Sequence, residues 1–430
     1  MRRIVFLILG FLFLIFPNVL WAQVTQEPWD LEGVNFQITN SLEGNYLPAI
    51  AASENLYLAV WYKKTPAGFD IYGARITRDG KVLDEGEDEI PICIAADDQM
   101  FPAVLWDGDN FFVAWQDRRS GRRWDIYGAK VTPDGQVLYG PEVTPDGEVL
   151  SPGGIPISIG KRTYDQSAPA ISFDGKNYLV VWQGKRSAKS RNIYFRMISK
   201  DIPEDGIIPE ENPVIPLSPS LKDQASPAVA FNGGMYFITW QEKRRGKFWG
   251  IIGARLLPWA ENLEKLDPEG IEISPMPDQK VEWDRSKPSV SWNGRFYFIV
   301  WTSQREKGKW FIEGKRLYPY SRAMDPEDFI LQSDTSNKIL PSIMWSGDEE
   351  QYLLLWEDEP EGNSKIYEAP IAPDSDPIII GDGVRVSEGT GASYPAVSRT
   401  GDEMLIIWQG LGPEDTWQIY GQRLSKLVTF

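Results

Sequence analysis

One sequence unit recurs seven times along this chain, and no other feature constrains its fold as strongly. Each unit contains a proline and, 13 or 15 residues later, a tryptophan that follows an apolar stretch. The pairs are Pro48 and Trp61, Pro102 and Trp115, Pro169 and Trp182, Pro227 and Trp240, Pro288 and Trp301, Pro341 and Trp356, and Pro395 and Trp408. Turn sequences such as Asp107-Gly108 and Asn293-Gly294 lie between them and favour the tight turn of a β-hairpin. The chain is therefore predicted to be one repeat array rather than two or three separate domains.

Two further strands complete each unit. A third strand follows the tryptophan, most clearly at residues 70–75, 125–130 and 418–423. A shorter fourth strand is predicted at residues 90–94, 155–159, 214–217, 271–273, 329–331 and 384–386. The seventh unit ends after its third strand, and residues 33–39 match the missing fourth one. Because a closed ring leaves no exposed sheet edge, we predict an all-β, seven-bladed β-propeller with four antiparallel strands per blade, in which the N-terminal strand closes the last blade.

The unit resembles the repeats of known propellers. Its elements Pro-Ala-Val, Asp-Gly, apolar-Trp and Ile-Tyr-Gly-Ala-Arg are similar to those of bacterial exported β-propellers, over residues 33–430. A more distant likeness extends to the propellers of TolB and of the N-terminal domain of dipeptidyl peptidase IV. The Gly-His of WD40 blades and the Ser-x-Asp-x-Gly-x-Thr-Trp box of sialidases do not occur in the chain. The resemblance therefore implies the fold and leaves the activity open.

The first 22 residues have the pattern of a secretory signal peptide. Arg2 and Arg3 precede an apolar run at residues 4–16, Pro17 ends the run, and Ala22 offers a small residue for cleavage. We therefore expect residues 1–22 to be removed and residues 23–430 to form a single propeller domain that is secreted or periplasmic. No later segment is apolar enough to span a membrane, so no membrane span is expected after cleavage.

Composition excludes several classes of function. The chain has no histidine and one cysteine, Cys93, which removes His-activated nucleophiles, His general bases, His metal ligands and intrachain disulfides. We expect no cofactor and no metal site. The formal net charge is −17, and loss of Arg2 and Arg3 makes it −19. Such an acidic surface disfavours a nucleic-acid partner.

Basic residues cluster in the loops between the second and third strands of the first five units. The candidate ligand-binding residues among them are Arg118, Arg119, Arg122, Arg123, Lys185, Arg186, Arg191, Arg244 and Arg245, with Trp124 as an aromatic neighbour. Arginine binds carboxylates and sulfates through forked hydrogen bonds, so these loops fit an anionic glycan or an acidic protein segment. The alternative is a set of solvated loops whose charges pair locally, as charge runs commonly do.

An acidic residue also precedes the repeat proline by four positions in four units. These residues are Asp98, Asp165, Asp223 and Asp284, and we include them among the candidate ligand-binding residues because they would ring the channel mouth. They could bind sugar hydroxyls or a cation, or form the acid–base pair of a glycoside hydrolase. The alternative is that they cap the entry to each strand by Asx-type turns, and their repetition favours this.

Three functions follow from these features. The leading hypothesis is an exported, non-catalytic propeller that binds or scaffolds a glycan or protein through its basic, aromatic loop face. A carbohydrate-active enzyme, either a glycoside hydrolase or a His-independent polysaccharide lyase, is the alternative, because two carboxylates or a Tyr or Lys base suffice for such chemistry. A scaffold with several partners around the rim is the third. The catalytic residues and the oligomeric state stay unassigned.

Overall fold

The structure is a computed structural model that describes residues 30–425 with short gaps. The gaps fall at residues 141, 144–148, 152, 159–163, 188–189, 204–205, 210–211, 245–247, 259–262, 275–283, 307, 321–324, 326–327, 332–335, 348–349, 360–362, 375–378 and 381–382. The predicted signal peptide, residues 1–22, lies outside the described residues. Within the described part, no helix is long and apolar enough to cross a membrane.

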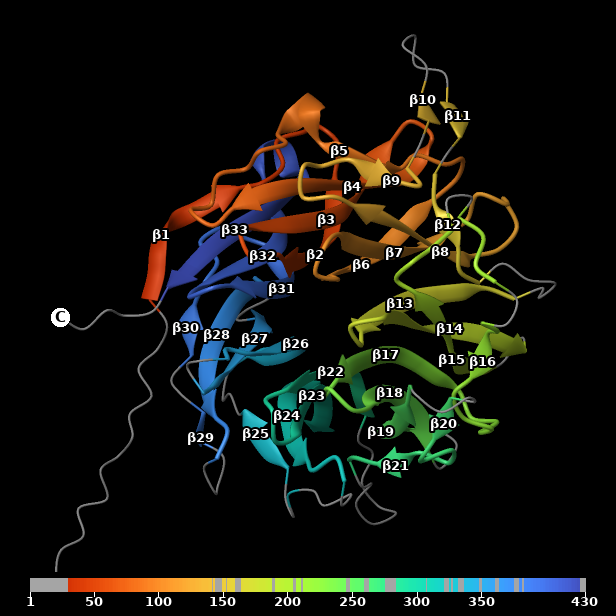
Figure 1. The fold of residues 1–430 in the computed structure, drawn as a ribbon. Helices are drawn as coiled ribbons and strands as arrows, with labels where there is room; N and C mark the ends of the chain where they lie inside the picture. The colour runs from red at the N-terminus through yellow and green to blue at the C-terminus, as the bar shows by residue number, and fades with distance from the viewer. Residues whose placement is uncertain are drawn as a thin grey trace, which may run out of the picture.

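Seven antiparallel sheets surround a central axis as the blades of a propeller (Figure 1). From the axis outward, blade 1 holds β2 (Asn45–Ala52), β3 (Leu56–Thr65), β4 (Gly68–Thr77) and β5 (Ile90–Cys93), and blade 2 holds β6 (Gln99–Trp106), β7 (Phe111–Asp117), β8 (Asp125–Val131) and β12 (Ile155–Pro156). Blade 3 holds β13 (Gln166–Phe173), β14 (Asn177–Ser187), β15 (Ser190–Ser199) and β16 (Ile215–Pro216), and blade 4 holds β17 (Gln224–Phe231), β18 (Tyr236–Arg244), β19 (Phe248–Leu257) and β21 (Ile271–Glu272).

The remaining three blades repeat this order. Blade 5 holds β22 (Asp284–Trp292), β23 (Tyr297–Glu306), β24 (Lys309–Leu317) and β25 (Phe329–Leu331), blade 6 holds β26 (Asn337–Trp345), β27 (Tyr352–Glu359), β28 (Lys365–Ala372) and β30 (Val384–Arg385), and blade 7 holds β31 (Ser393–Thr400), β32 (Glu403–Leu411), β33 (Trp417–Ser425) and β1 (Asp30–Gln37). Short extra pieces, β9 (Val137–Leu138), β20 (Glu264–Lys265) and β29 (Ile379–Ile380), lengthen the third-strand hairpins of blades 2, 4 and 6. Within the described residues, the 3-10 turns η1 (Gly86–Asp88) and η3 (Pro413–Asp415) lie in loops. The seven-bladed architecture predicted from the repeat is confirmed.

The N-terminal strand closes the ring. β1 pairs antiparallel with β33, with Phe36 opposite Gly421 and Gln37 opposite Tyr420. The backbone N–H of Ile38 then donates to the carbonyl of Ile419 at 2.8 Å. The prediction that residues 33–39 complete blade 7 is therefore confirmed, and the strand begins slightly earlier than the sequence pattern indicated.

A duplicated segment forms a hairpin outside the ring. Residues 131–138 and 143–150 carry nearly the same sequence. In the structure, β9 in the first copy joins blade 2, whereas β10 (Glu142–Val143) and β11 (Val149–Ser151) pair with each other. Figure 1 shows β10 and β11 projecting beyond the blades. The duplication adds a protruding loop and leaves the ring intact.

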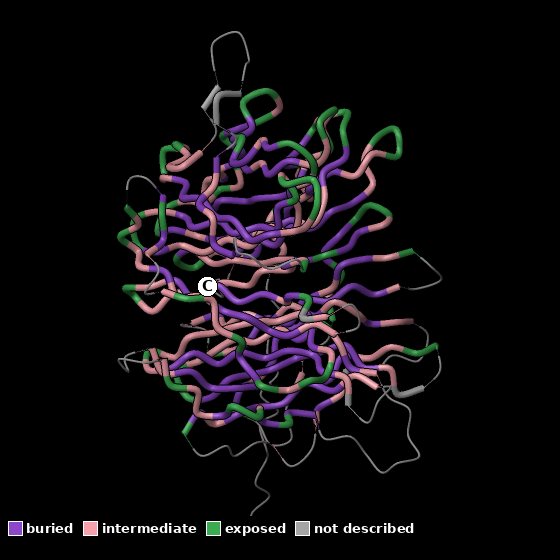
Figure 2. Tube along the Cα trace, turned by 90° about the vertical axis from the view of Figure 1, so that its right-hand side faces the viewer, coloured by how far each residue is buried: buried purple, intermediate pink, exposed green. Residues whose placement is uncertain are grey.

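The repeat tryptophans lie in the hydrophobic core between blades. All seven are at most 2% exposed, and each of the seven hydrophobic clusters that contain them combines residues of two neighbouring blades. Figure 2 shows the buried residues running along the strands and the exposed ones gathering in the connecting loops. Truncating such a tryptophan to alanine would cost about 3–5 kcal/mol.

The arginine of the Ile-Tyr-Gly-Ala-Arg motif connects one blade to the next. Arg316 forms an ion pair with Asp325 of its own blade at 2.9 Å and donates to the carbonyl of Pro373 in blade 6 at 2.8 Å. Arg75, Arg255 and Arg423 make the equivalent contacts to the carbonyls of Pro133, Pro319 and Arg78. The motif therefore serves the assembly of the ring.

The glycine of the same motif gives the strands room to pack. A Cβ atom at Gly253 would lie 2.2 Å from the ring of Phe237, and one at Gly314 would lie 2.0 Å from Phe329. Blade 6 departs from this pattern because Glu368 occupies the position, opposite Leu355 of β27. The side chain of Glu368 is fully buried.

Candidate functional site

The innermost strand of every blade is interrupted at the residue before the repeat proline. These seven residues, called here the bulge residues, are Leu47, Phe101, Ala168, Ser226, Lys287, Leu340 and Tyr394, and all have φ angles between 44° and 56°. In each case the strand register shifts around the bulge residue and its proline, as between Tyr46 and Ala49. A positive φ is costly for a residue with a side chain, so each bulge needs contacts that hold it.

Those contacts come from the neighbouring blade. At the bulge a backbone N–H is left without a partner in the strand ladder. It donates a hydrogen bond to the side chain of a residue in the preceding blade, the one directly after that blade's repeat tryptophan. The donor–acceptor distances are 2.9 Å for Leu47 to Gln409, 3.2 Å for Ala168 to Gln116, 3.0 Å for Ser226 to Gln183, 3.1 Å for Lys287 to Gln241 and 3.2 Å for Leu340 to Thr302. Glu357 is hydrogen-bonded by the backbone of Tyr394 in the same way, and burial raises its pKa to about 7.

The contact between blades 1 and 2 differs. Tyr62 stands where the other blades have a hydrogen-bond acceptor, and its ring centroid lies 6.2 Å from that of the bulge residue Phe101. Tyr62 also stacks on Tyr46 at 5.3 Å and meets Phe69 edge-on at 5.4 Å. An aromatic cluster therefore replaces the polar contact at this one blade boundary.

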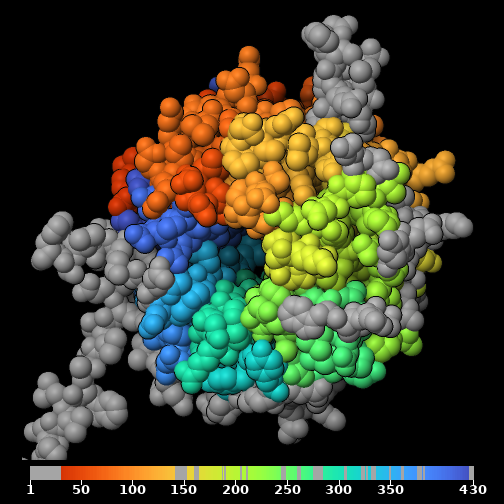
Figure 3. All heavy atoms as spheres, in the orientation of Figure 1, coloured from red at the N-terminus to blue at the C-terminus, as the bar shows by residue number. Residues whose placement is uncertain are grey.

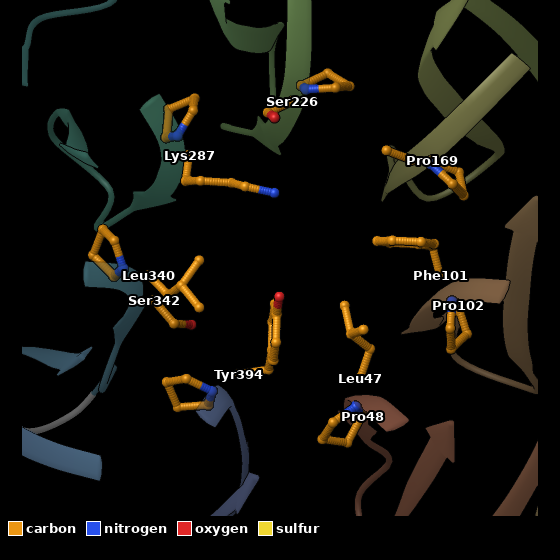
Figure 4. Close-up of a pocket in the computed structure, with 15 residues that line it drawn as sticks. Leu47, Pro48, Phe101, Pro102, Pro169, Ser226, Lys287, Leu340, Ser342 and Tyr394 are labelled. Carbon is orange, nitrogen blue, oxygen red and sulfur yellow. The ribbon is translucent and has the colours of Figure 1, made fainter. Parts of the chain in front are cut away.

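The bulge residues line a cavity in the channel. This channel cavity has a volume of about 340 Å³ and is walled by the seven bulge residues, the seven repeat prolines and Ser342. Figure 3 shows a hollow at the centre of the ring, and Figure 4 shows Lys287, Leu47 and Tyr394 pointing into the open space. Every blade has the repeat proline, whereas the bulge residue differs among blades. The backbone around the channel is therefore repeated, while the side chains that line the cavity vary.

A second cavity adjoins the first on the side of blades 2, 3 and 4. This mouth cavity has a volume of about 530 Å³ and shares Phe101, Ala168, Ser226 and Lys287 with the channel cavity. Small bulge residues, Ala168 and Ser226, leave space at this side of the ring. The mouth cavity is also lined by Trp124, Asp165, Lys185 and Arg191, four of the residues selected from the sequence.

The charges around the mouth cavity are partly paired. Lys185 contacts Asp165 at 2.6 Å, with the two side chains 49% and 29% exposed, and Arg191 contacts Asp223 at 3.0 Å. Partial burial pushes the pKa of Asp165 upward, but hydrogen bonds from Lys185 and from the backbone of Trp124 outweigh it, so the pKa lies below its ordinary value. The Arg191 guanidinium lies 5.7 Å from the ring of Trp249, over which Lys243 lies at 5.4 Å.

The acidic residues link neighbouring blades. The carboxylates of Asp165, Asp223 and Asp284 accept backbone N–H groups of Trp124, Arg191 and Trp249 at 3.2, 2.9 and 3.0 Å. Each acceptor therefore caps the third strand of the preceding blade, and Asn337 does the same for Trp310 at 3.1 Å. The Asx-type turns expected from the sequence would cap the entry to each strand, whereas these carboxylates bind the backbone of the preceding blade. Asp98 lies at the corresponding position beside Gly68 of blade 1.

Apart from Lys185 and Arg191, the predicted basic residues fall into three groups. Arg119 is held inside the fold, because it pairs with Asp117 at 2.6 Å, donates to the carbonyl of Gly153 and covers the ring of Tyr127 at 3.9 Å. Arg118 and Arg122 are exposed, and Arg123 contacts Asp125 at 3.1 Å. Arg245 and the side chains of Arg186 and Arg244 lie outside the described residues.

The bulge residues are not among the residues predicted from the sequence. The residue before a proline normally adopts an extended conformation, so the repeat prolines give no indication of a ring of positive φ angles. The available signal was the contrast between a constant proline and a variable preceding residue. No group of three or more Cys, Asp or Glu side chains among the described residues is placed to hold a metal ion.

The fold is similar to that of solved propeller structures. A puromycin hydrolase is 12% identical, with a TM-score of 0.54, and the match covers 94% of this chain and 58% of that one. The polysaccharide lyase Uly1 is 12% identical, with a TM-score of 0.53 and coverage of 88% and 89%. The acylaminoacyl peptidase of Pyrococcus horikoshii is 11% identical, with a TM-score of 0.47 and coverage of 88% and 52%. At these identities the likeness concerns the fold alone.

No protein-family model and no curated protein matches the sequence. The chain spans about 58% of the length of the puromycin hydrolase.

Proposed function

We propose that this protein is an exported, non-catalytic propeller that binds an anionic glycan at the mouth of its channel. The observation that carries the proposal is the mouth cavity, in which Trp124, Lys185 and Arg191 line one space of about 530 Å³. Cavities of roughly 300–1,000 Å³ are the usual size for small-ligand sites. The space is sufficient for a short saccharide segment.

The chemistry of the lining supports an acidic sugar. Arg191 and Lys185 supply donors for a carboxylate or sulfate, and a charge-assisted hydrogen bond contributes about 1.5–3 kcal/mol. Both are partly exposed and already paired with aspartates, so solvent and competition reduce their contribution to about 1 kcal/mol each. The indole of Trp124 offers an apolar face for a sugar ring.

The loops around the mouth cavity extend the positive surface. Arg118 and Arg122 are exposed on the loop that leads to Trp124, and Lys64 and Lys309 are exposed near the end of β3 and at the start of β24, the equivalent positions in blades 1 and 5. An anionic polymer would meet these side chains on either side of the cavity. A globally acidic protein that concentrates positive charge on one face selects ligands by local rather than overall charge.

A carbohydrate-active enzyme is the second candidate. Asp165 is the only carboxylate among the described residues that line the two cavities, whereas glycoside hydrolysis by the usual route needs two. Lys287 and Tyr394 line the channel cavity, and both side-chain types serve as bases without histidine. This favours a His-independent lyase over a hydrolase within the second candidate.

Binding measurements on defined oligosaccharides test the proposal. We expect uronate-containing or sulfated oligosaccharides to bind at low ionic strength, with affinity that falls as salt is added, and neutral oligosaccharides of equal length to bind weakly. Arg191→Gln and Lys185→Gln should each weaken binding by about threefold to tenfold, and Trp124→Ala by a similar factor. Isothermal titration calorimetry measures each value.

The matched control is Arg295→Gln. Arg295 pairs with Asp374 and lies in the turn between β22 and β23, at the opposite ends of the strands from the cavity loops. The Arg295→Gln substitution removes one positive charge, as Arg191→Gln does, at a site away from the mouth cavity. It should leave the affinity for anionic oligosaccharides unchanged. Absence of binding to every anionic oligosaccharide at low salt would refute the proposal. Release of unsaturated sugar products, abolished by Lys287→Gln, would favour the lyase instead.

A further inference from the structure

Lys287 is a lysine with unusual surroundings. It is the only charged residue among the described residues that line the channel cavity. Figure 4 shows its side chain extending into the centre of the ring, toward which the Tyr394 hydroxyl also points. Its backbone is fixed in the bulge conformation at φ 54° by the hydrogen bond to Gln241. The amine is therefore presented to the cavity by a rigid part of the fold.

The Lys287 amine has no ion-pair partner in the described part of the chain. Lys185 and Arg191, which share the mouth cavity with it, are paired with Asp165 and Asp223. The side chain of Lys287 is reached by solvent, yet the protein walls that surround it disfavour the charged form and lower the pKa of the amine. An uncharged amine in a cavity is the form that reacts with carbonyl carbon.

We propose that Lys287 condenses with small carbonyl compounds that enter the channel, and that it prefers those that also carry a carboxylate. The preference for a carboxylate rests on the anion site proposed above, because Lys185 and Arg191 line the same mouth cavity as Lys287. The reactivity of the amine does not depend on that site. The substrate class is therefore an aldehyde or keto acid small enough for the channel cavity of about 340 Å³.

The reaction balances with the groups present. The lone pair of the Lys287 nitrogen forms a bond to the carbonyl carbon, the carbonyl electrons move to oxygen, and a proton passes from nitrogen to oxygen to give a carbinolamine. The Tyr394 hydroxyl is placed in the same cavity, and burial raises the pKa of this phenol, so it keeps its proton. It protonates the leaving hydroxyl, water departs, and the nitrogen lone pair forms the C=N bond. The phenolate then regains a proton from the iminium nitrogen, which leaves a neutral imine.

Reductive trapping tests the reactivity. The full protein is incubated with glyoxylate and sodium cyanoborohydride near neutral pH, and modified lysines are located by peptide mass spectrometry. We expect carboxymethylation of Lys287 to be faster than that of the exposed Lys64 and Lys309 by on the order of tenfold. Because all three rates come from one sample of wild-type protein, the comparison does not depend on a variant that folds. Equal rates at the three lysines would overturn the proposal.

Two further measurements test the role of Tyr394 and the preference for a carboxylate separately. Tyr394→Phe should slow adduct formation at Lys287 while rates at Lys64 stay the same; an unchanged rate would refute the role of the phenol. Glyoxylate should react faster than propionaldehyde at Lys287, and Lys185→Gln should reduce that difference. If both aldehydes react equally fast at Lys287, the carboxylate preference is wrong while the amine is still reactive. If the protein binds no anionic glycan but Lys287 is still trapped rapidly, the proposed glycan-binding function is wrong and the proposed reactivity of Lys287 stands.

Discussion

Replacement of Glu368 should change stability in a strongly pH-dependent way. Glu368 takes, in blade 6, the third-strand position that glycine fills in five other blades, and neither of its carboxylate oxygens has a hydrogen-bond partner in the described structure. Burial raises the pKa of this carboxyl from 4.5 to about 8. At neutral pH the folded protein therefore holds Glu368 protonated, while the unfolded chain ionises it.

The sign of the effect follows from proton binding. Between the two pKa values the folded state binds more protons than the unfolded state, so stability falls as pH rises through that window. At about 1.4 kcal/mol for each pH unit, the loss between about pH 5 and about pH 7 amounts to about 2.5 kcal/mol. Glu368→Gln removes this titration, so its free energy of unfolding should gain that amount relative to the wild type over the same interval.

Denaturant unfolding followed by tryptophan fluorescence measures the difference at the two pH values. Glu272→Gln is the matched control, because Glu272 is an exposed residue on the outer strand β21 and carries the same chemical change. The control should show the same difference from wild type at both pH values. If Glu368→Gln also differs from wild type by a constant amount, Glu368 is not the buried neutral carboxyl described here, and the reasoning is wrong.

Three further perturbations test how the ring is held together. Gln183→Leu removes the acceptor for the N–H of Ser226 and should cost about 1–3 kcal/mol in chemical unfolding, whereas Gln183→Glu, which retains an acceptor, should cost less. Arg316→Lys loses the forked contact with Asp325 and should also lower the unfolding free energy by about 1–3 kcal/mol; an unchanged value would contradict the role of the motif arginine. Deletion of residues 1–39 leaves the edge of β33 unpaired, so size-exclusion chromatography should show oligomers or aggregates, and a stable monomer would contradict the closure argument.

Local patterns along the chain were sufficient to predict the architecture. The proline–tryptophan spacing, the Asp-Gly and Asn-Gly turns and the missing fourth strand of the last unit are each visible within one stretch of sequence, and together they determine blade number and closure. Trp124 lies in the loop between the second and third strands of blade 2, as expected, whereas Lys185 and Arg191 lie on β14 and β15 rather than in the loop predicted for blade 3.

Contacts between blades could not be predicted in the same way. The partner of Asp165 is the backbone of Trp124, 41 residues earlier, and the partner of the Ser226 N–H is Gln183, 43 residues earlier. Nothing in the sequence around either donor or acceptor specifies the other. The lining of the channel depends on the positive φ angles of the bulge residues, which are stabilised by these same contacts, so the site became visible only with the folded ring.

The pairing of β1 with β33 joins the first strand of the described ring to the last one in chain order. During synthesis β1 has no partner strand, because β33 comes last in chain order. The six blades between them form before the ring can close. Assembly is complete only once residue 425 is available, so the final shape is a property of the finished chain.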